Sequence, residues 1–185
     1  MRIVAGKYGG RRLTVPKGRD IRPTSDKVRG AIFNSLESMG AVAGVRALDC
    51  FCGTGALGLE ALSRGAEFCS FMDKDKRSLA LAQGNAERLG ALGQSEFLLR
   101  DAQRFTRSSN MLKYGLVFLD PPYRKGLINV VLQVLERSGC FDMAAVVVLE
   151  SEKGYEPNLS GSFTVQSTKI YGDTQVQFVI YNDTP

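Results

Sequence analysis

Apolar residues recur along the chain in two alternating patterns, and this alternation predicts the fold. Short apolar runs predict buried strands over residues 45–48, 68–72, 96–99, 116–119 and 145–149. Apolar residues at helical spacing, bounded by capping residues and glycines, predict helices over residues 25–39, 56–64, 79–89 and 127–135. Strands that alternate with helices at this spacing are typical of βαβ units, in which helices cover both faces of a parallel sheet.

The two ends of the chain depart from this alternation. Near the C-terminus, strand-like runs over residues 163–171 and 174–181 meet at Gly172-Asp173, which predicts a β-hairpin and an antiparallel last strand. At the N-terminus, scattered apolar residues around a glycine pair predict a short hairpin or loop that packs on the domain. We therefore expect a basic N-terminal arm over residues 1–23 and one domain over residues 24–185.

The composition excludes several kinds of active site. The chain has 185 residues, 44% of them hydrophobic, and it contains no histidine. A histidine-based catalytic triad and a histidine-ligated metal are therefore excluded, and we expect no metal. The four cysteines show no C-x-x-C spacing, and no apolar run reaches the ~20 residues of a membrane span. Without the apolar stretch of a signal peptide at the N-terminus, a cytoplasmic protein is expected.

Positive charge is concentrated at one end. The net charge is +5, yet the first 29 residues contain nine basic and two acidic residues, and the remainder is slightly acidic. Such asymmetry favours an arm that meets a polyanion, with nucleic acid as the leading candidate. A solvated basic tail is the alternative.

A glycine motif follows the first predicted strand. Gly53, Gly55 and Gly58 form G-x-G-x-x-G between a strand and a helix, the context that a nucleotide-type cofactor requires. The motif alone leaves a dinucleotide and S-adenosylmethionine as alternatives. The negative charge of Asp49, before the loop, would repel a pyrophosphate but suits a cofactor with an ammonium group. Asp73, after the second strand, suits ribose hydroxyls in either cofactor.

A third carboxylate completes the expected crevice. Asp101 follows the third strand, where it could accept a hydrogen bond from an adenine amino group. Carboxylates at the carboxyl ends of successive parallel strands line the crevice in which such sheets bind ligands. Taken alone, Asp101 is better explained as a helix cap.

The tetrapeptide Asp120-Pro121-Pro122-Tyr123 follows the strand at 116–119. Two prolines lack backbone donors and make the turn stiff, so its carbonyls can accept hydrogen bonds from a ligand. The Asp120 carboxylate and the Pro121 carbonyl could hold both hydrogens of an exocyclic amine and direct its lone pair at a methyl donor. Tyr123 could stack on an extracted base.

Several of these motifs resemble those of a known family. Asp-Pro-Pro-Tyr after an apolar strand is similar to the catalytic motif of class I methyltransferases that act on exocyclic amines. The stretches 1–7, 22–29, 49–66 and 169–174 resemble more narrowly the bacterial 16S rRNA guanine-N2 methyltransferases of the RsmD type. The resemblance covers essentially the whole chain.

The resemblance implies a Rossmann-like class I methyltransferase with a mostly parallel seven-stranded sheet and a C-terminal antiparallel hairpin. It implies methyl transfer from S-adenosylmethionine to the N2 amine of one guanine in 16S rRNA, on a 30S particle, by a monomeric enzyme. Two departures stand out: Cys50 and Cys52 replace the family's usual loop residues, and Asp73 stands where glutamate is more common. Neither removes a needed functional group, and both cysteines are expected to be buried small side chains.

Three groups of candidate site residues follow. The expected catalytic residues are Asp120, Pro121, Pro122 and Tyr123. The expected cofactor-binding residues are Asp49, Phe51, Gly53, Thr54, Gly55, Asp73, Lys74, Asp101, Ala102 and Asp120. The expected RNA-binding residues are Arg2, Lys7, Arg11, Arg12, Arg22, Thr24 and Arg29, although Arg29 could instead support the cofactor loop.

Three other functions are alternatives. A nicotinamide-dependent oxidoreductase would share the glycine loop and Asp73 but gives no purpose to the Asp-Pro-Pro-Tyr motif or the arm. A non-catalytic RNA-binding factor would not need an intact residue 120–123 motif. An adenine-N6 DNA methyltransferase uses a similar tetrapeptide, but the chain has no evident target-recognition domain for DNA.

Overall fold

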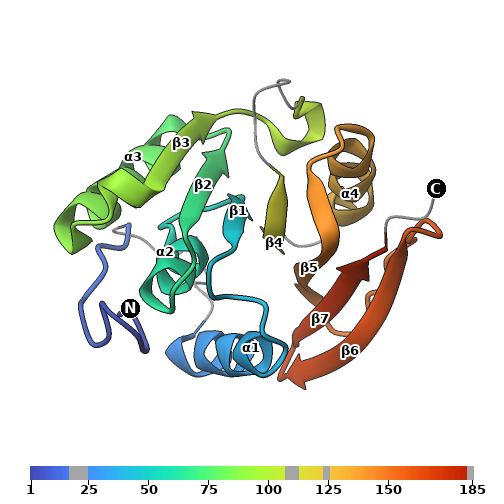
Figure 1. The fold of residues 1–185 in the computed structure, drawn as a ribbon, viewed down its shortest axis with the longest axis horizontal. Helices are drawn as coiled ribbons and strands as arrows, with labels where there is room; N and C mark the ends of the chain where they lie inside the picture. Colours follow the sequence, from blue (N-terminus) through green and yellow to red (C-terminus); the bar gives the residue numbers. More distant parts are fainter. Residues whose placement is uncertain (17–24, 107–112, 123–125, 183–185) are drawn as a thin grey trace.

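The computed structural model describes residues 1–16, 25–106, 113–122 and 126–182, which form an α/β fold around one sheet (Figure 1). Its helices are α1 (Asp26–Ser38), α2 (Ala56–Ser63), α3 (Lys76–Leu89) and α4 (Leu127–Arg137), with short 3₁₀ turns η1 (Leu92–Gln94) and η2 (Ala102–Arg104). Its strands are β1 (Arg46–Cys50), β2 (Phe68–Asp73), β3 (Ser95–Leu99), β4 (Tyr114–Leu119), β5 (Phe141–Glu152), β6 (Phe163–Tyr171) and β7 (Thr174–Tyr181). The predicted helices and strands are confirmed, with ends that shift by a few residues.

The sheet has seven strands in the order β3-β2-β1-β4-β5-β7-β6. The first five in this order pair in parallel, and β7 runs antiparallel to both β5 and β6. The predicted mostly parallel sheet with a C-terminal antiparallel hairpin is confirmed. Because the parallel order reverses direction between β1 and β4, the carboxyl ends of these two strands form a switch point where such sheets bind ligands.

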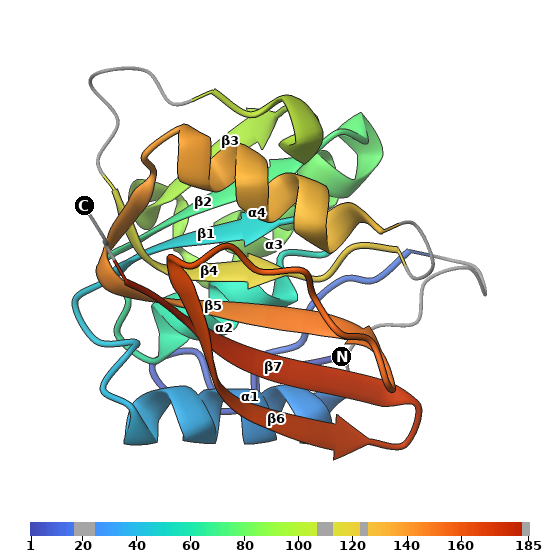
Figure 2. The same cartoon turned by 90° about the vertical axis from the view of Figure 1, so that its right-hand side faces the viewer.

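Helices cover both faces of the sheet, as expected. Figure 2 shows α1 along one face and α4 along the other. One apolar cluster joins α1, α2, α3 and the N-terminal arm to sheet residues such as Phe71 and Phe118. The second cluster joins α4 and η2 to the opposite face, through residues such as Val117 and Leu149. Among the described residues, no helix is long and apolar enough to cross a membrane.

The described part of the basic arm, residues 1–16, packs on the domain through three apolar side chains. Ile3, Tyr8 and Leu13 are all buried in the cluster that contains α2 and α3. An antiparallel bridge between Arg2 and Arg12 closes a hairpin around residues 3–11, which confirms the expected local structure. The expected boundary at residues 23 and 24 lies outside the described residues.

Candidate active site

The register of the parallel strands brings the expected carboxylates to one edge of the sheet. Cys50 at the end of β1 pairs with Met72 of β2 and with Leu119 of β4. Asp73 and Asp120 therefore lie at the same level, just beyond the last residues of β2 and β4 that pair with β1, and Asp49 lies two residues earlier, at the level of Phe71 and Phe118. Since side chains alternate between faces along a strand, all three lie on the face covered by α1, α2 and α3.

The glycine loop adopts backbone conformations that the sequence motif requires. Gly53 and Gly55 have φ angles of 53° and 76°, in the left-handed region that favours glycine, and Phe51 shares this region at 60°. The backbone N–H of Gly53 donates to Asp73 Oδ2 at 3.1 Å. The N–H of Cys52 donates to the Met72 carbonyl at 3.0 Å. These bonds tie the loop to the end of β2, so the loop has one defined position beside Asp73.

The third glycine of the motif, Gly58, has a different role. A Cβ atom at Gly58 would lie 2.4 Å from the Phe71 ring and 2.6 Å from Cys69 Sγ. Both neighbours are fully buried in β2. Glycine at this position therefore lets α2 pack directly on the sheet, and it exposes a backbone N–H that Asp49 can reach.

Asp49 is a buried carboxylate that is held by a backbone N–H. Its Oδ2 accepts from the Gly58 N–H at 2.9 Å, and the residue is 2% exposed. Burial, together with the charge of Asp73, raises the pKa of Asp49 to about 8, against the lowering effect of the Gly58 hydrogen bond. A cation placed beside Asp49 would favour its ionised form, so the site suits a positively charged ligand group.

Asp73 and Asp101 shape the edge of the site next to β3. Asp73 accepts from the Asp75 N–H at 2.9 Å as well as from Gly53. Asp101 caps η2, since its Oδ1 accepts from the Gln103 N–H at 3.0 Å. The helix-cap role considered for Asp101 is thus present in the structure. Of the remaining expected cofactor residues in this region, Ala102 is buried and Lys74 is exposed.

The expected catalytic motif begins at the end of β4. Asp120 is half-buried, Pro121 is buried and Pro122 is exposed. Asp120 follows Leu119, the partner of Cys50, so the motif starts beside the glycine loop as the sequence predicted. Tyr123 lies outside the described residues.

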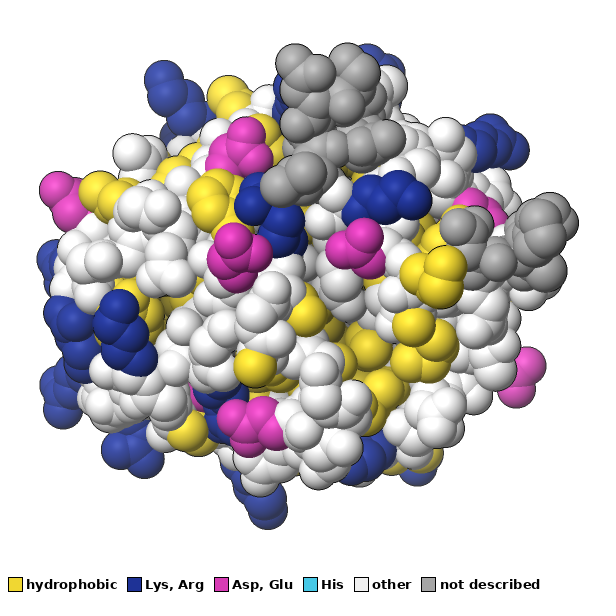
Figure 3. Space-filling view, in the orientation of Figure 1, with side chains coloured by type: hydrophobic (Ala, Val, Ile, Leu, Met, Phe, Trp, Pro, Cys, Tyr) yellow, Lys and Arg dark blue, Asp and Glu magenta, His cyan; other side chains and the backbone are white. Residues whose placement is uncertain are grey.

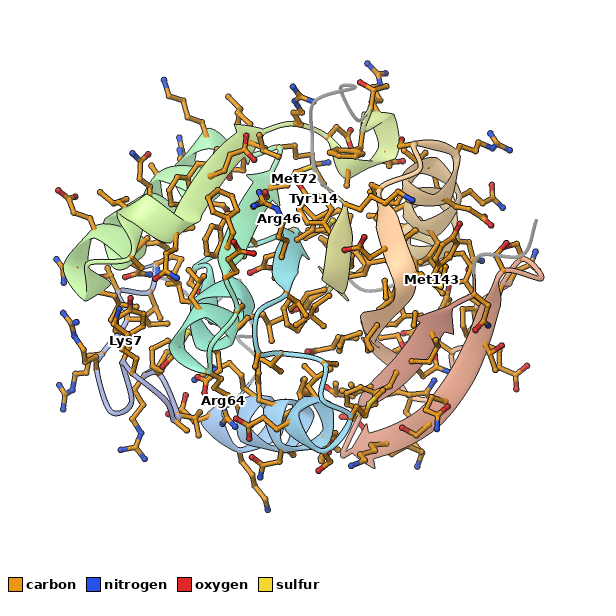
Figure 4. All side chains as sticks on the ribbon, in the orientation of Figure 1. Lys7, Arg46, Arg64, Met72, Tyr114 and Met143 are labelled. Carbon is orange, nitrogen blue, oxygen red and sulfur yellow. The ribbon has the colours of Figure 1, made fainter. Side chains whose placement is uncertain are left out.

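Four of the expected RNA-binding residues are exposed on the arm. Figure 3 shows Lys and Arg side chains along the side of the molecule formed by the arm and α3, and Figure 4 places Lys7 at the hairpin. The four exposed positions are Arg2, Lys7, Arg11 and Arg12. Two further expected residues, Arg22 and Thr24, lie outside the described residues.

Two of these basic residues are also tied to helix ends. The Lys7 N–H donates to the Ser63 carbonyl at the end of α2, at 2.7 Å. The Arg11 guanidinium donates to the carbonyls of Arg88 and Leu89 at the end of α3. Both helices begin near the carboxyl edge of the sheet, so the hairpin tip lies at the edge opposite the glycine loop.

Arg29 requires a correction. The expected RNA contact is wrong for this residue in the structure, because its side chain is fully buried. The guanidinium donates to Asp26 Oδ1 at 2.8 Å and to the Arg2 carbonyl, and its Nε lies 3.5 Å from Glu60 Oε2. Arg29 therefore supports the junction between α1, α2 and the arm and presents no charge to a phosphate.

Three residues that hold this region together escaped the sequence reasoning. Glu60 accepts from the N–H groups of Val4 and Ala5 at 2.7 and 3.0 Å, and Ser63 Oγ accepts from Tyr8 N–H at 2.9 Å. Asn85 joins the arm to the glycine loop. One signal was available: Glu60 and Ser63 are polar residues inside an otherwise apolar helix, and such residues need partners when buried.

The cysteines are structural. All four are free and buried, including Cys50 and Cys52 beside the glycine loop. Burial raises the pKa of the thiols of Cys50, Cys52 and Cys69 above the ordinary range, so they stay protonated and weakly nucleophilic. The expectation that the loop cysteines are buried small side chains is confirmed. In the described part of the chain, no group of three or more His, Cys, Asp or Glu side chains could hold a metal ion.

Comparison with known proteins places this geometry in a family. The sequence model of the family described as conserved hypothetical protein 95 matches residues 1–180. Ribosomal RNA small subunit methyltransferase D of Escherichia coli K12 is 34% identical over 184 residues, covering 98% of this chain and 89% of the relative. The Bacillus subtilis protein YlbH is 32% identical over 179 residues, covering 95% and 96% of the two chains.

The solved structures agree with the sequence relatives. The Escherichia coli protein yhhF superimposes with a TM-score of 0.88 at 30% identity, covering 100% of this chain and 99% of the other. The similarity thus includes the arm, the glycine loop, the Asp120 motif and the C-terminal hairpin. Over nearly its whole length, this chain is a member of the conserved hypothetical protein 95 family, the methyltransferase family that includes the RsmD enzymes.

Proposed function

We propose that the protein transfers a methyl group from S-adenosylmethionine to the exocyclic N2 amine of a guanine in 16S rRNA. The observation that carries the proposal is the placement of Asp120-Pro121-Pro122 at the end of β4, beside the glycine loop at the end of β1. The groups that would accept the amine hydrogens and the loop that would hold the cofactor then share one edge of the sheet. The family relationship supports RNA as the substrate class.

The residues of the crevice fit S-adenosylmethionine. Asp49 suits the ammonium group of the methionine portion, because that cation would favour the ionised form of the buried carboxyl, and Asp73 suits ribose hydroxyls. Phe51, Gly53, Thr54 and Gly55 supply a loop whose backbone a ligand can approach closely. Lys74, Asp101 and Ala102 would border the adenine. When bound, the cofactor supplies a methyl group that its sulfonium has already activated.

The Asp120 motif supplies the amine site. The Asp120 carboxylate accepts one amine hydrogen and the Pro121 carbonyl accepts the other, which fixes the direction of the nitrogen lone pair. Pro121 and Pro122 restrict the backbone, so the acceptors are held in place before the substrate arrives. Tyr123 stacks on the guanine. The nitrogen gains the methyl group as the methyl–sulfur bond breaks, and the proton that it loses passes to the Asp120 carboxylate or to water, so no histidine base is needed.

The basic arm supplies contacts that position the RNA. Arg2, Lys7, Arg11, Arg12, Arg22 and Thr24 meet phosphates, which fixes the register of the RNA without reading its sequence. Base choice then depends on the pocket around Asp120 and on the shape of the 30S particle. We infer that the enzyme acts as a monomer in the cytoplasm, where 30S particles are found.

The test is incubation of the protein with labelled S-adenosylmethionine and either 30S particles or free 16S rRNA, followed by nucleoside analysis. We expect N2-methylguanosine, with more product from 30S particles than from free RNA. N6-methyladenosine would instead support an adenine methyltransferase. Calorimetry with S-adenosylhomocysteine and with NAD provides the binding control, and binding of NAD alone would contradict the proposal.

A further inference from the structure

One buried amide joins the two halves of the proposed site. Asn85, in α3, is 1% exposed. Its Nδ2 donates to the Thr54 carbonyl at 2.9 Å, between Gly53 and Gly55 of the glycine loop. The same Nδ2 donates to the Thr14 carbonyl at 3.0 Å, and its Oδ1 accepts from the Thr14 N–H at 2.8 Å.

These three bonds use both amide hydrogens of the side chain and one of its acceptor sites. Breaking any of them would leave a buried polar group without its partner, which is unfavourable. The side chain of Asn85 is therefore hydrogen-bonded to the arm and to the glycine loop at the same time. Movement of the loop away from Asn85 would disturb the amide that also fixes Thr14.

Packing around Asn85 restricts such movement further. One turn before it on the same face of α3, Ala82 lies close enough to the loop that a Cβ at Gly55 would be 3.0 Å from Ala82 Cβ. On the other side of the loop, Thr54 Oγ1 lies 3.5 Å from Met1 Sδ in the arm. The loop is thus enclosed between α3 and the arm.

We propose that Asn85 is a positioning residue that couples the glycine loop to the basic arm, so that cofactor binding and RNA binding favour each other. The inference rests on the proposed function, in which the loop holds S-adenosylmethionine and the arm meets RNA. A ligand that contacts the loop and restrains it further also restrains Asn85 and Thr14, and the next ligand meets an arm whose motion is already reduced. Such coupling is reciprocal between the two sites.

Hydrogen exchange of single backbone amides tests the coupling, with S-adenosylhomocysteine as the probe. The Thr14 N–H has no place in the cofactor site, yet saturation with the probe should slow its exchange by about fivefold or more. The matched control is the Tyr8 N–H, in the same arm but bonded to Ser63 Oγ. Its exchange should change little, which separates the coupling from general stabilisation.

The variants sharpen the result. In Asn85→Ala the probe should no longer slow exchange at Thr14, whereas Gln83→Ala, an exposed position on the same helix, should behave as the wild type. The probe should also tighten binding of wild-type protein to 30S particles, but not binding of Asn85→Ala.

Several results would overturn the inference. An unchanged Thr14 exchange rate in the saturated wild type would do so, as would equal slowing at Thr14 and Tyr8 or a retained response in Asn85→Ala. If Asn85→Ala does not fold, the wild-type comparison of the two amides still decides. If the wild type does not bind the probe at all, the proposed function fails, and this inference fails with it.

Discussion

Asp49 Oδ2 accepts a hydrogen bond from the backbone N–H of Gly58 at 2.9 Å, which joins the end of β1 to the first turn of α2. The bond spans the whole glycine loop, because residues 50–57 lie between its two ends. It depends on both residues: only a glycine lets α2 approach β2 this closely, and only an acceptor on β1 can use the N–H so exposed. The cofactor loop is therefore closed at its base by this pair.

The pKa of Asp49 predicts a specific pH dependence in the absence of cofactor. Because the folded-state pKa is raised from 3.8 to about 8, the folded protein holds a proton that the unfolded chain loses above pH 4. Stability from this group is complete below about pH 4 and is lost as the pH rises to about 8, with a limiting slope of about 1.4 kcal/mol per pH unit. Asp49→Asn should lack this loss, so its free energy of unfolding relative to the wild type should rise between these pH values. Urea denaturation across that range measures it, and parallel pH profiles would contradict the assignment.

Gly58→Ala should destabilise the protein by about 1–3 kcal/mol, the usual range for overpacking a tight core. The added methyl group would collide with Phe71 and Cys69, which are both fully buried, so neither can move aside freely. Gly84→Ala in α3 is the matched control, since a Cβ there meets no atom within 4 Å. That control should stabilise the helix by about 0.5–1 kcal/mol. Denaturation midpoints of the two variants that shift in the same direction would show that packing at Gly58 is not the cause.

Much of the fold could be predicted because its signals are local. The apolar runs of β1, β2, β4 and β5 and the spacing in α4 each report burial directly, and Gly172-Asp173 marks the β6–β7 turn. The carboxylates at the strand ends could also be placed together, since parallel strands in register end at one edge. These inferences needed no knowledge of which distant residues meet.

The network under the arm could not be predicted, because it depends on distant contacts. Arg29 carries a positive charge in a basic segment, and the sequence does not reveal that Glu60, 31 residues later, lies beside it. Asn85 likewise meets Thr14 across 71 residues. Charge along a sequence indicates a surface only when the fold leaves that charge outside, and for Arg29 it does not.

Arg29→Met should destabilise the folded protein by about 3–5 kcal/mol, the usual result of removing one partner from a buried charge cluster. Glu60 would keep Arg64 at 2.9 Å but lose its other charged neighbour, and the Arg2 carbonyl would lose a donor. Lys27→Met is the control on the exposed side of the same helix and should change stability by less than about 0.5 kcal/mol. Thermal or urea unfolding distinguishes them. An Arg29→Met protein of normal stability that binds RNA poorly would restore the original expectation of a phosphate contact.

Asp120→Asn should lower the rate of methyl transfer by about 10²–10³-fold, comparable to losing one well-placed polar group at a reacting centre. The amide keeps the shape of the carboxylate but replaces an acceptor oxygen by a donor, which opposes the amine hydrogens. Affinity for S-adenosylhomocysteine, measured by calorimetry, should change far less than the rate. Asp142→Asn, an exposed aspartate at the opposite end of the sheet, provides a matched substitution that should leave the rate unchanged. Full activity in Asp120→Asn would rule out the proposed alignment of the amine.

Arg11 and Arg12 are neighbours with the same charge, and the structure separates their expected roles. Arg12 is exposed, and within the described residues its side chain makes no hydrogen bond or ion pair, so Arg12→Ala should remove a phosphate contact. The slope of log affinity for RNA against log salt should then flatten by about 0.7–0.9, the change expected for one phosphate. Arg11 has a structural role as well, because it donates to the final carbonyls of α3, where a cation also interacts favourably with the helix dipole. Arg11→Ala should therefore lower the free energy of unfolding by about 1 kcal/mol, an effect that Arg12→Ala should not share.

Filter binding of 30S particles at several salt concentrations measures the salt slope, and urea unfolding measures the free energy of unfolding. An unchanged slope in Arg12→Ala would mean that this part of the arm is only solvated, and the RNA contacts would then have to come from the other exposed basic residues.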